Sequence, residues 1–202
     1  MKTKNMMTAC CMALLAAGFT ACGGQKKAET TAVSTPDETT TAVAATAAAD
    51  SVGYIVKVGD MAPDFTMTLT DGSEVTLSAL RGKLVMLQFT ASWCGVCRKE
   101  MPFIESDIWQ RHKDNANFVL MGVDRDEPLD KVQDFAKSTG ITYPLGLDPG
   151  ADIFALYAVR DAGITRNVLI DPSGKIVKLT RLYNEEEFAS LVAMIDRMLA
   201  TS

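Results

Sequence analysis

The feature that most constrains the fold is a cysteine pair, Cys94 and Cys97, at the junction of a predicted strand and a predicted helix. The apolar run 84–89 precedes the pair, and the helix-prone stretch 98–101 follows it. A cysteine at a helix N-terminus has its thiolate stabilised by the helix dipole and by free backbone N–H groups. The second sulfur lies one turn further on the same face, where it can attack a disulfide formed by the first. The spacing therefore predicts a strand, a loop and a helix arranged for dithiol–disulfide exchange.

The N-terminus predicts export. Two lysines, Lys2 and Lys4, precede the apolar stretch 6–19. This stretch is too short for a permanent membrane span and is typical of a secretory signal peptide. We therefore expect residues 1–21 to be a signal peptide and the remaining chain to face the periplasm.

The end of this leader predicts a lipid anchor. Residues 19–24, Phe-Thr-Ala-Cys-Gly-Gly, resemble the lipobox of bacterial lipoproteins. Cys22 would then be lipidated, become the first residue of the mature protein and tether it to a membrane. Phe19 stands where leucine is usual in this motif, so cleavage near Ala21 without lipidation is the alternative.

The chain after the leader divides into a linker and one domain. Residues 22–53 are rich in alanine and threonine and hold few large apolar side chains, which predicts a flexible linker. Residues 54–202 have the length of a single domain. Loss of the two leader lysines changes the formal net charge from −5 to −7, which argues against nucleic acid as a partner.

The cysteine pair has two alternative interpretations. A zinc site needs four ligands, and the mature chain offers only Cys22 and His112 besides the pair, so we expect no metal. Two inert buried cysteines are the other alternative. Exported proteins commonly hold stable disulfides, but a disulfide between two cysteines three residues apart cannot crosslink distant segments of a fold. The redox interpretation is therefore favoured.

The remaining pattern predicts strands that alternate with helices. The expected strands are 65–70, 74–77, 84–89, 117–123, 167–170 and 175–182. The expected helices are 94–110, 128–140, 149–159 and 185–199. Asp71-Gly72 marks a hairpin turn, Ser78 a cap before a short turn, and Asn184 with Glu187 a capping box. This order predicts an α/β domain with a mixed sheet of the thioredoxin type.

Within the helix 94–110, Met101, Ile104 and Ile108 mark the face turned toward the core, and Pro102 is expected to kink the helix.

Four segments together resemble the TlpA/ResA-type membrane-anchored thiol–disulfide oxidoreductases. They are 58–65 (VGDMAPDF), 80–83 (LRGK), 89–94 (FTASWC) and 98–102 (RKEMP), within a match over about residues 55–199. The resemblance implies a thioredoxin-like fold with an N-terminal β-hairpin and an inserted α/β element before the last strands. It implies a reductant of disulfides in the cell envelope that uses no cofactor.

The resemblance also implies partners. These are disulfide-bearing envelope proteins, with apocytochrome c as one candidate, and a membrane electron donor such as a DsbD- or CcdA-like protein. The residues between the cysteines, Gly95-Val96, carry no charge. Strongly oxidising relatives have a histidine there, so a reducing or intermediate potential is favoured.

The same resemblance assigns roles to individual residues. Cys94 corresponds to the exposed nucleophile, Cys97 to the resolving thiol, and Trp93 to the tryptophan that walls the site. Glu100 corresponds to the glutamate that handles the proton of the resolving cysteine, a task suited to a carboxylate with a raised pKa in apolar surroundings. The alternative for Glu100 is a solvated helix residue. In thioredoxins a buried acid lies six residues before the first cysteine, where this chain has Gln88.

One departure concerns the substrate groove. The family has a cis-proline facing the cysteines, and counting back from Ile170-Asp171 places Thr165 there. A cis peptide before threonine costs about 3 kcal/mol, so a trans peptide is expected. We expect Ile164 and Thr165 to line the groove and Arg166 to face it; a surface arginine is the alternative for Arg166.

Two rival functions come from other classes. A peroxiredoxin needs threonine or serine three residues before its cysteine and proline seven before, but Cys94 has Ala91 and Leu87 at these positions. A non-catalytic binding module is the second rival, and the intact cysteine pair argues against it.

Overall fold

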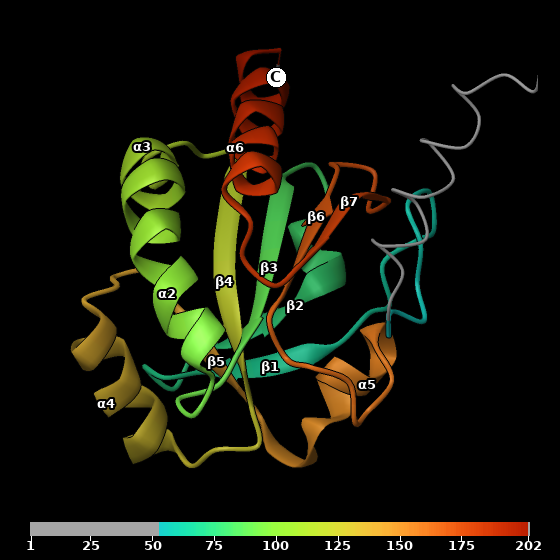
Figure 1. Ribbon diagram of the computed structural model, residues 1–202. Helices are drawn as coiled ribbons and strands as arrows, with labels where there is room; N and C mark the ends of the chain where they lie inside the picture. Colours follow the sequence, from blue (N-terminus) through green and yellow to red (C-terminus); the bar gives the residue numbers. More distant parts are fainter. Residues whose placement is uncertain (1–52, 202) are drawn as a thin grey trace, which may run out of the picture. The chain divides into compact units, whose positions relative to one another are not determined.

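The computed structural model describes residues 53–201 (Figure 1). The predicted signal peptide 1–21, the predicted lipidation site Cys22 and all of the predicted linker except Gly53 lie outside these residues. Gly53 itself accepts a hydrogen bond from the Val159 N–H, so it is already tied to the domain. Within 53–201, no helix has the length and apolar character needed to cross a membrane.

A seven-stranded mixed sheet forms the centre of the domain (Figure 1). The strand order is β2-β1-β5-β4-β3-β6-β7. β3 pairs in parallel with β4, and β4 with β5, while the remaining pairs are antiparallel. The strands are β1 Thr66–Leu69, β2 Glu74–Thr76, β3 Leu84–Thr90, β4 Phe118–Arg125, β5 Leu145–Asp148, β6 Arg166–Ile170 and β7 Ile176–Arg181. The predicted α/β fold with a mixed sheet and an N-terminal hairpin is confirmed.

The helices cover both faces of the sheet, as the alternation along β3 shows. Phe89 packs against Phe154 and Tyr157 of α5, with ring centroids 5.5 and 5.4 Å apart. Its neighbour Thr90 instead donates a hydrogen bond to Met101 Sδ of α2. Successive side chains of a strand point to opposite faces, so α2 and α5 lie on opposite sides of the sheet. The helices are α2 Gly95–Phe103, α3 Gln110–His112, α4 Leu129–Thr139, α5 Asp152–Tyr157 and α6 Glu185–Ala200.

The helix that follows the cysteines is continuous but not uniform. A π-helical segment, Ile104–Trp109, joins α2 to α3 and begins two residues after Pro102. Proline has no N–H to donate and so interrupts the regular i→i−4 ladder, and π-helical turns occur mostly as insertions inside α-helices. Met101, Ile104 and Ile108 are fully buried, which confirms the predicted core face. α6 begins as predicted, because Asn184 Oδ1 accepts the Glu187 N–H at 2.9 Å.

The sequence analysis misses one strand and makes two wrong local predictions. The sequence does not predict β5, because Pro144 and Pro149 flank it and Gly146 lies within it. The strand forms because β4 and β1 both offer hydrogen-bonding edges to it, and Met67 of β1 occupies the space that a side chain at 146 would need.

The predicted helix 149–159 is a 3-10 turn, Pro149–Ala151, followed by the shorter α5. The last two residues of the 3-10 turn are left-handed, Gly150 at φ 72° and Ala151 at φ 59°, which prevents one continuous helix. Ser78 is not a helix cap: the 3-10 helix Leu77–Leu80 begins after Thr76, and the Ser78 N–H donates to Asp64 Oδ1 instead.

Candidate active site

The cysteine pair lies at the start of α2, where β3 ends and the chain turns. Cys94 is the N-cap residue and its N–H donates to Ala91 O at 3.0 Å. Cys94 and Cys97 form a disulfide with Cα atoms 5.3 Å apart, and the Cys97 N–H donates to Cys94 Sγ at 3.1 Å. Cys94 is 7% exposed and Cys97 is 0% exposed. An incoming molecule therefore reaches the sulfur of Cys94 before that of Cys97.

Thr165 lies against the disulfide. Its hydroxyl oxygen is 3.2 Å from Cys94 Sγ and 3.3 Å from Cys97 Sγ. The residue is the last before β6, and its carbonyl accepts the Leu182 N–H at 3.0 Å, which ties this loop to the end of β7. Thr165 thus lies beside the disulfide, at the place inferred by counting back from Asp171. Its role in the substrate groove and the trans peptide before it stay predictions.

Glu100 is a buried carboxyl, one turn after Cys97 on α2. It is 1% exposed, so the alternative of a solvated helix residue is wrong. Its Oε1 accepts a hydrogen bond from Asn167 Nδ2 at 2.7 Å, whereas Oε2 has no hydrogen-bond partner among the described residues. Burial raises the pKa of Glu100 to about 7, and the Asn167 hydrogen bond opposes part of the rise. A carboxyl with this pKa can exchange a proton near neutral pH.

A polar network surrounds Glu100 inside the core. Asn167 Nδ2 also donates to Thr180 Oγ1 at 2.9 Å, and the Tyr54 hydroxyl donates to the Thr180 carbonyl at 2.7 Å. On the other side, Gln88 Oε1 accepts the Tyr143 hydroxyl at 2.6 Å. The Gln88 amide nitrogen makes no hydrogen bond, yet it is near enough to lower the Glu100 pKa.

Sequence reasoning did not assign a role to Asn167 or Tyr143. The available signal was a polar side chain inside a strand that is otherwise apolar, at both Gln88 and Asn167. Such residues are rarely buried without a partner, so each points to another polar group inside the domain.

The other predicted groove residues differ in their surroundings. Trp93 is 64% exposed beside the nucleophile, whereas Ile164 is buried next to Thr165. Arg166 does not face the groove, and it is not a surface arginine either. It is 1% exposed, its guanidinium lies 4.4 Å from the centre of the Tyr54 ring, and its Nε donates to Gly163 O at 3.1 Å. Thr165 points to the disulfide, so the next residue along the strand points to the opposite side.

Sequence reasoning missed Leu182 at the rim of the site. Its N–H holds the Thr165 carbonyl, its side chain is exposed, and its φ of 64° is unusual for a branched residue. No local sequence signal marks a leucine for this conformation.

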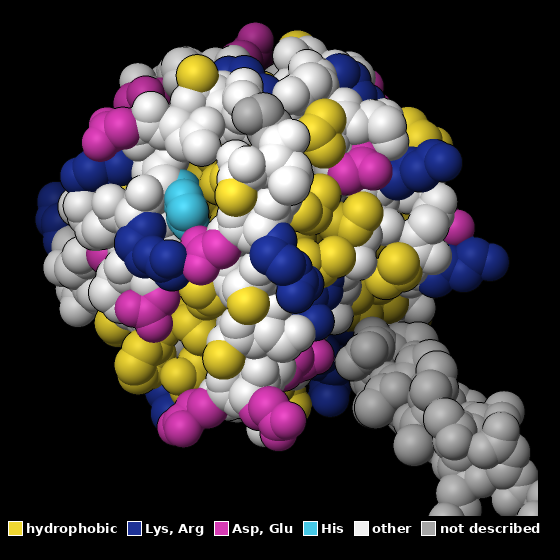
Figure 2. Space-filling model, turned by 90° about the horizontal axis from the view of Figure 1, so that it is seen from above, with side chains coloured by type: hydrophobic (Ala, Val, Ile, Leu, Met, Phe, Trp, Pro, Cys, Tyr) yellow, Lys and Arg dark blue, Asp and Glu magenta, His cyan; other side chains and the backbone are white. Residues whose placement is uncertain are grey.

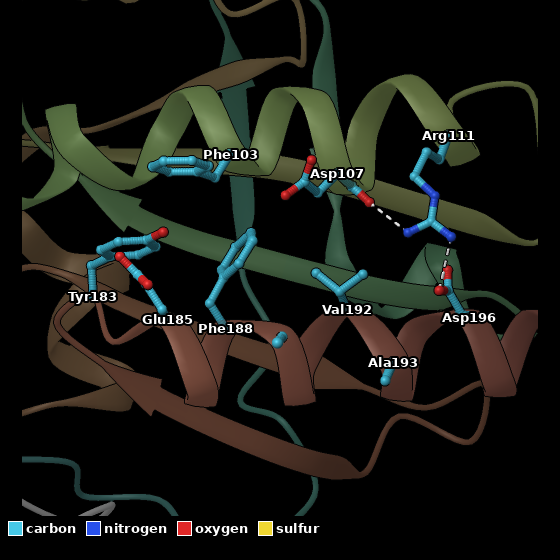
Figure 3. A pocket seen from close by; sticks show the side chains of 10 residues that line it. Phe103, Asp107, Arg111, Tyr183, Glu185, Phe188, Val192, Ala193 and Asp196 are labelled. Atoms are coloured by element: carbon cyan, nitrogen blue, oxygen red, sulfur yellow. Dashed lines mark hydrogen bonds and ion pairs between the residues drawn. The ribbon is translucent and has the colours of Figure 1, made fainter. Parts of the chain in front are cut away.

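A hollow away from the cysteines lies between the helix of α2–α3 and α6 (Figure 3). At one end Phe103 stacks on Tyr183, with ring centroids 5.3 Å apart. At the other end Asp196 pairs with Arg111 at 2.9 Å and with His112 at 2.8 Å. On the face seen in Figure 2, acidic and basic side chains alternate with hydrophobic ones. Neither cysteine lines this hollow, and the described residues contain no cluster of three or more potential metal ligands.

Comparisons with known proteins agree with this geometry. The Redoxin family profile matches residues 57–195, more than half of the 202-residue chain. The thiol-disulfide oxidoreductase ResA of Bacillus cereus is 32% identical over 123 residues, which span 61% of this chain and 69% of that protein. ResA of Bacillus subtilis is 33% identical over 124 residues, 61% of this chain and 67% of that protein.

Solved structures show the same fold. A candidate protein disulfide isomerase from Bacteroides thetaiotaomicron is 81% identical, with a TM-score of 0.72, covering 73% of this chain and 93% of that one. A DsbE-type thiol:disulfide interchange protein from Chlorobium tepidum is 27% identical, with a TM-score of 0.63, covering 71% and 99%. The chain therefore belongs to the Redoxin family, among its thioredoxin-like thiol–disulfide oxidoreductases of the TlpA/ResA type.

Proposed function

We propose that this oxidoreductase reduces protein disulfides in the cell envelope, with Cys94 as nucleophile, Cys97 as resolving thiol and Glu100 as the group that takes the Cys97 proton. The observation that carries the proposal is the buried carboxyl of Glu100, one helical turn behind the buried sulfur of Cys97. The difference in exposure between the two sulfurs supports the order of attack.

The reaction proceeds in two exchanges. In the reduced protein, the Cys94 thiolate attacks one sulfur of the substrate disulfide, forms a mixed disulfide and releases the other substrate sulfur as a thiolate. Glu100 then accepts the proton of the Cys97 thiol, and the Cys97 thiolate attacks Cys94 Sγ. The second substrate thiolate leaves as the Cys94–Cys97 disulfide forms. Two electrons have then passed from the protein to the substrate.

The surroundings of each sulfur favour its role. The helix N-terminus at Cys94 stabilises a thiolate, because the Cys97 N–H, which has no partner within the helix, donates to Cys94 Sγ. Glu100 is neutral or charged with similar probability near pH 7, which suits an acceptor that must later release its proton. The Thr165 hydroxyl, in reach of both sulfurs, can donate a hydrogen bond to whichever one is charged.

The substrate surface in this proposal consists of the exposed Trp93 and the loop at Ile164 and Thr165. Trp93 offers a large apolar face beside the nucleophile, and Thr165 brings the loop against the disulfide. The substrates are disulfide-bearing envelope proteins, with apocytochrome c as one candidate. Electrons would return from a membrane donor such as a DsbD- or CcdA-like protein.

Export and anchoring complete the proposal. Residues 1–21 would direct secretion, lipidated Cys22 would hold the protein at a membrane, and residues 22–53 would let the domain 54–202 reach its partners. Support comes from the leader and lipobox pattern of the sequence.

The decisive experiment compares insulin-disulfide reduction with peroxide consumption and adds the reduction potential. We expect insulin reduction without peroxidase activity, and a reduction potential of about −270 mV rather than about −120 mV. Peroxide consumption without insulin reduction would favour the peroxiredoxin-like alternative. Absence of both would favour a binding module.

A further inference from the structure

Ser92, the residue before Trp93 and Cys94, has a hydrogen-bond partner for each of its polar atoms. The Ser92 N–H donates to Glu127 Oε2 at 2.5 Å, and its hydroxyl donates to Glu127 Oε1 at 2.6 Å. The Ser92 carbonyl accepts the Nε–H of Arg98 at 2.8 Å. A carboxylate that accepts two hydrogen bonds from one residue fixes its orientation as well as its position.

Both holding side chains are themselves placed by the region around α4. Glu127 lies two residues before this helix. Arg98 stacks its guanidinium over Phe135 of α4, 4.9 Å from the ring centre, and donates to Ser138 Oγ at 3.2 Å. Ser92 is thus hydrogen-bonded to Glu127 and to Arg98. The turn that presents Cys94 cannot shift without breaking these bonds.

A second carboxyl lies behind Glu127. Asp124 of β4 is fully buried, and neither of its oxygens has a hydrogen-bond donor among the described residues. The carboxyl of Glu127, three residues further along the chain, interacts with that of Asp124, and Asp148 of β5 adds a further negative charge. Two such carboxyls can hydrogen-bond only when one of them holds a proton.

The surroundings decide which carboxyl keeps that proton. Burial, and after it the charges of Glu127 and Asp148, raises the pKa of Asp124 to about 8. Asp148 is occupied in a different role, because its two oxygens accept the N–H groups of Ile153 and Phe154 at 2.8 Å each.

We propose that Glu127 and Arg98 are positioning residues that clamp Ser92, and with it Cys94, and that a proton shared between Asp124 and Glu127 opens and closes this clamp with pH. The proposal rests on the proposed function, which gives Cys94 the nucleophilic role. With the proton present, Asp124 donates to Glu127 and leaves both Glu127 oxygens directed at Ser92. Without it, Asp124 and Glu127 repel each other, and Glu127 is pushed away from Ser92.

The first experiment reads the clamp through Trp93 and does not depend on catalysis. The chain has two tryptophans, so a Trp109→Phe background leaves Trp93 as the fluorophore next to Ser92. The oxidised protein is used, because its cysteines do not titrate. We expect a fluorescence step near pH 8, absent in Asp124→Asn and retained in the exposed control Asp130→Asn. The amide of Asp124→Asn stays uncharged and can donate at every pH, so this variant should fold. A wild-type step that Asp124→Asn retains, or a wild type without a step, would overturn the pH switch.

The second experiment tests the positioning role in the reduced protein. Ser92→Ala and Glu127→Gln should each slow insulin reduction by about five- to tenfold, because displacing a reacting atom costs rate steeply. The double variant should be no slower than the slower single variant, since both changes break the same contact. Additive losses would remove the clamp from the mechanism. A wild type without reductase activity would instead refute the proposed function and leave the fluorescence result standing.

Discussion

Because the carboxyl of Glu100 is buried, we expect the free energy of unfolding to fall as pH rises. The substitution Glu100→Gln should abolish this part of the pH dependence. Its folded-state pKa, about 7, lies above the usual 4.5. The unfolded chain therefore loses this proton first as pH rises, and the folded state is penalised. The folded state is at its most stable with respect to Glu100 below about pH 4.5, where the carboxyl is neutral in both states. This stability is lost as pH rises through 7. Glu100→Gln is neutral at every pH and removes this dependence.

The size of this change in stability follows from the pKa values of Glu100 in the folded and unfolded states. Linkage gives a loss of about 2 kcal/mol in wild type between pH 5 and 7, approaching about 3 kcal/mol above pH 8. The free energy of unfolding of Glu100→Gln minus that of wild type should rise by these amounts. Other titrating groups, Asp124 among them, are common to both proteins and cancel in the difference.

The assay is urea unfolding followed by circular dichroism at pH 5, 6, 7 and 8. The oxidised protein is used, so that Cys97 does not titrate and the slopes can be compared between variants. Glu74→Gln, an exposed change on β2, is the matched control and should give a difference that does not vary with pH. If the Glu100→Gln difference varies by less than about 0.5 kcal/mol across the range, the carboxyl is not held neutral by burial and the reasoning fails. In the reduced protein, the same variant should slow the resolving step by about tenfold or more, measured by stopped-flow exchange.

Three further outcomes are expected. Cys97→Ser should accumulate a mixed disulfide through Cys94, seen as an adduct in mass spectra, and faster alkylation of Cys97 than of Cys94 in the reduced wild type would reverse the assigned roles. Thr165→Pro should change the preference among disulfide substrates, measured by kcat/KM for two peptides, rather than abolish folding; an unchanged ratio would separate Thr165 from substrate binding. Cys22→Ala should move the protein from the membrane fraction to the soluble fraction, and a wild type recovered entirely without lipid would exclude the anchor.

The strongest local patterns were sufficient to predict the framework of this domain. β3 and the core face of the helix after it were readable because a fully buried strand and an amphipathic helix have distinct periods. The cysteine spacing and the strand before it together predicted the redox pair. The TlpA/ResA resemblance, through a count back from Asp171, placed Thr165 beside it. These features depend on neighbours within a few residues or on a fixed count along one strand.

The tertiary structure alone decided the electrostatics and the edges of the site. Glu100 has the same chemistry in sequence whether solvated or buried; only packing against β3 and β6 gives it Asn167 as a partner and a raised pKa. Arg166 was misread for the same reason, since its neighbour Tyr54 is distant in sequence. β5 forms only because β1 and β4 flank it. Burial and pairing are sums over contacts between distant segments, so a sequence pattern specifies them only where the local signal already implies the neighbour.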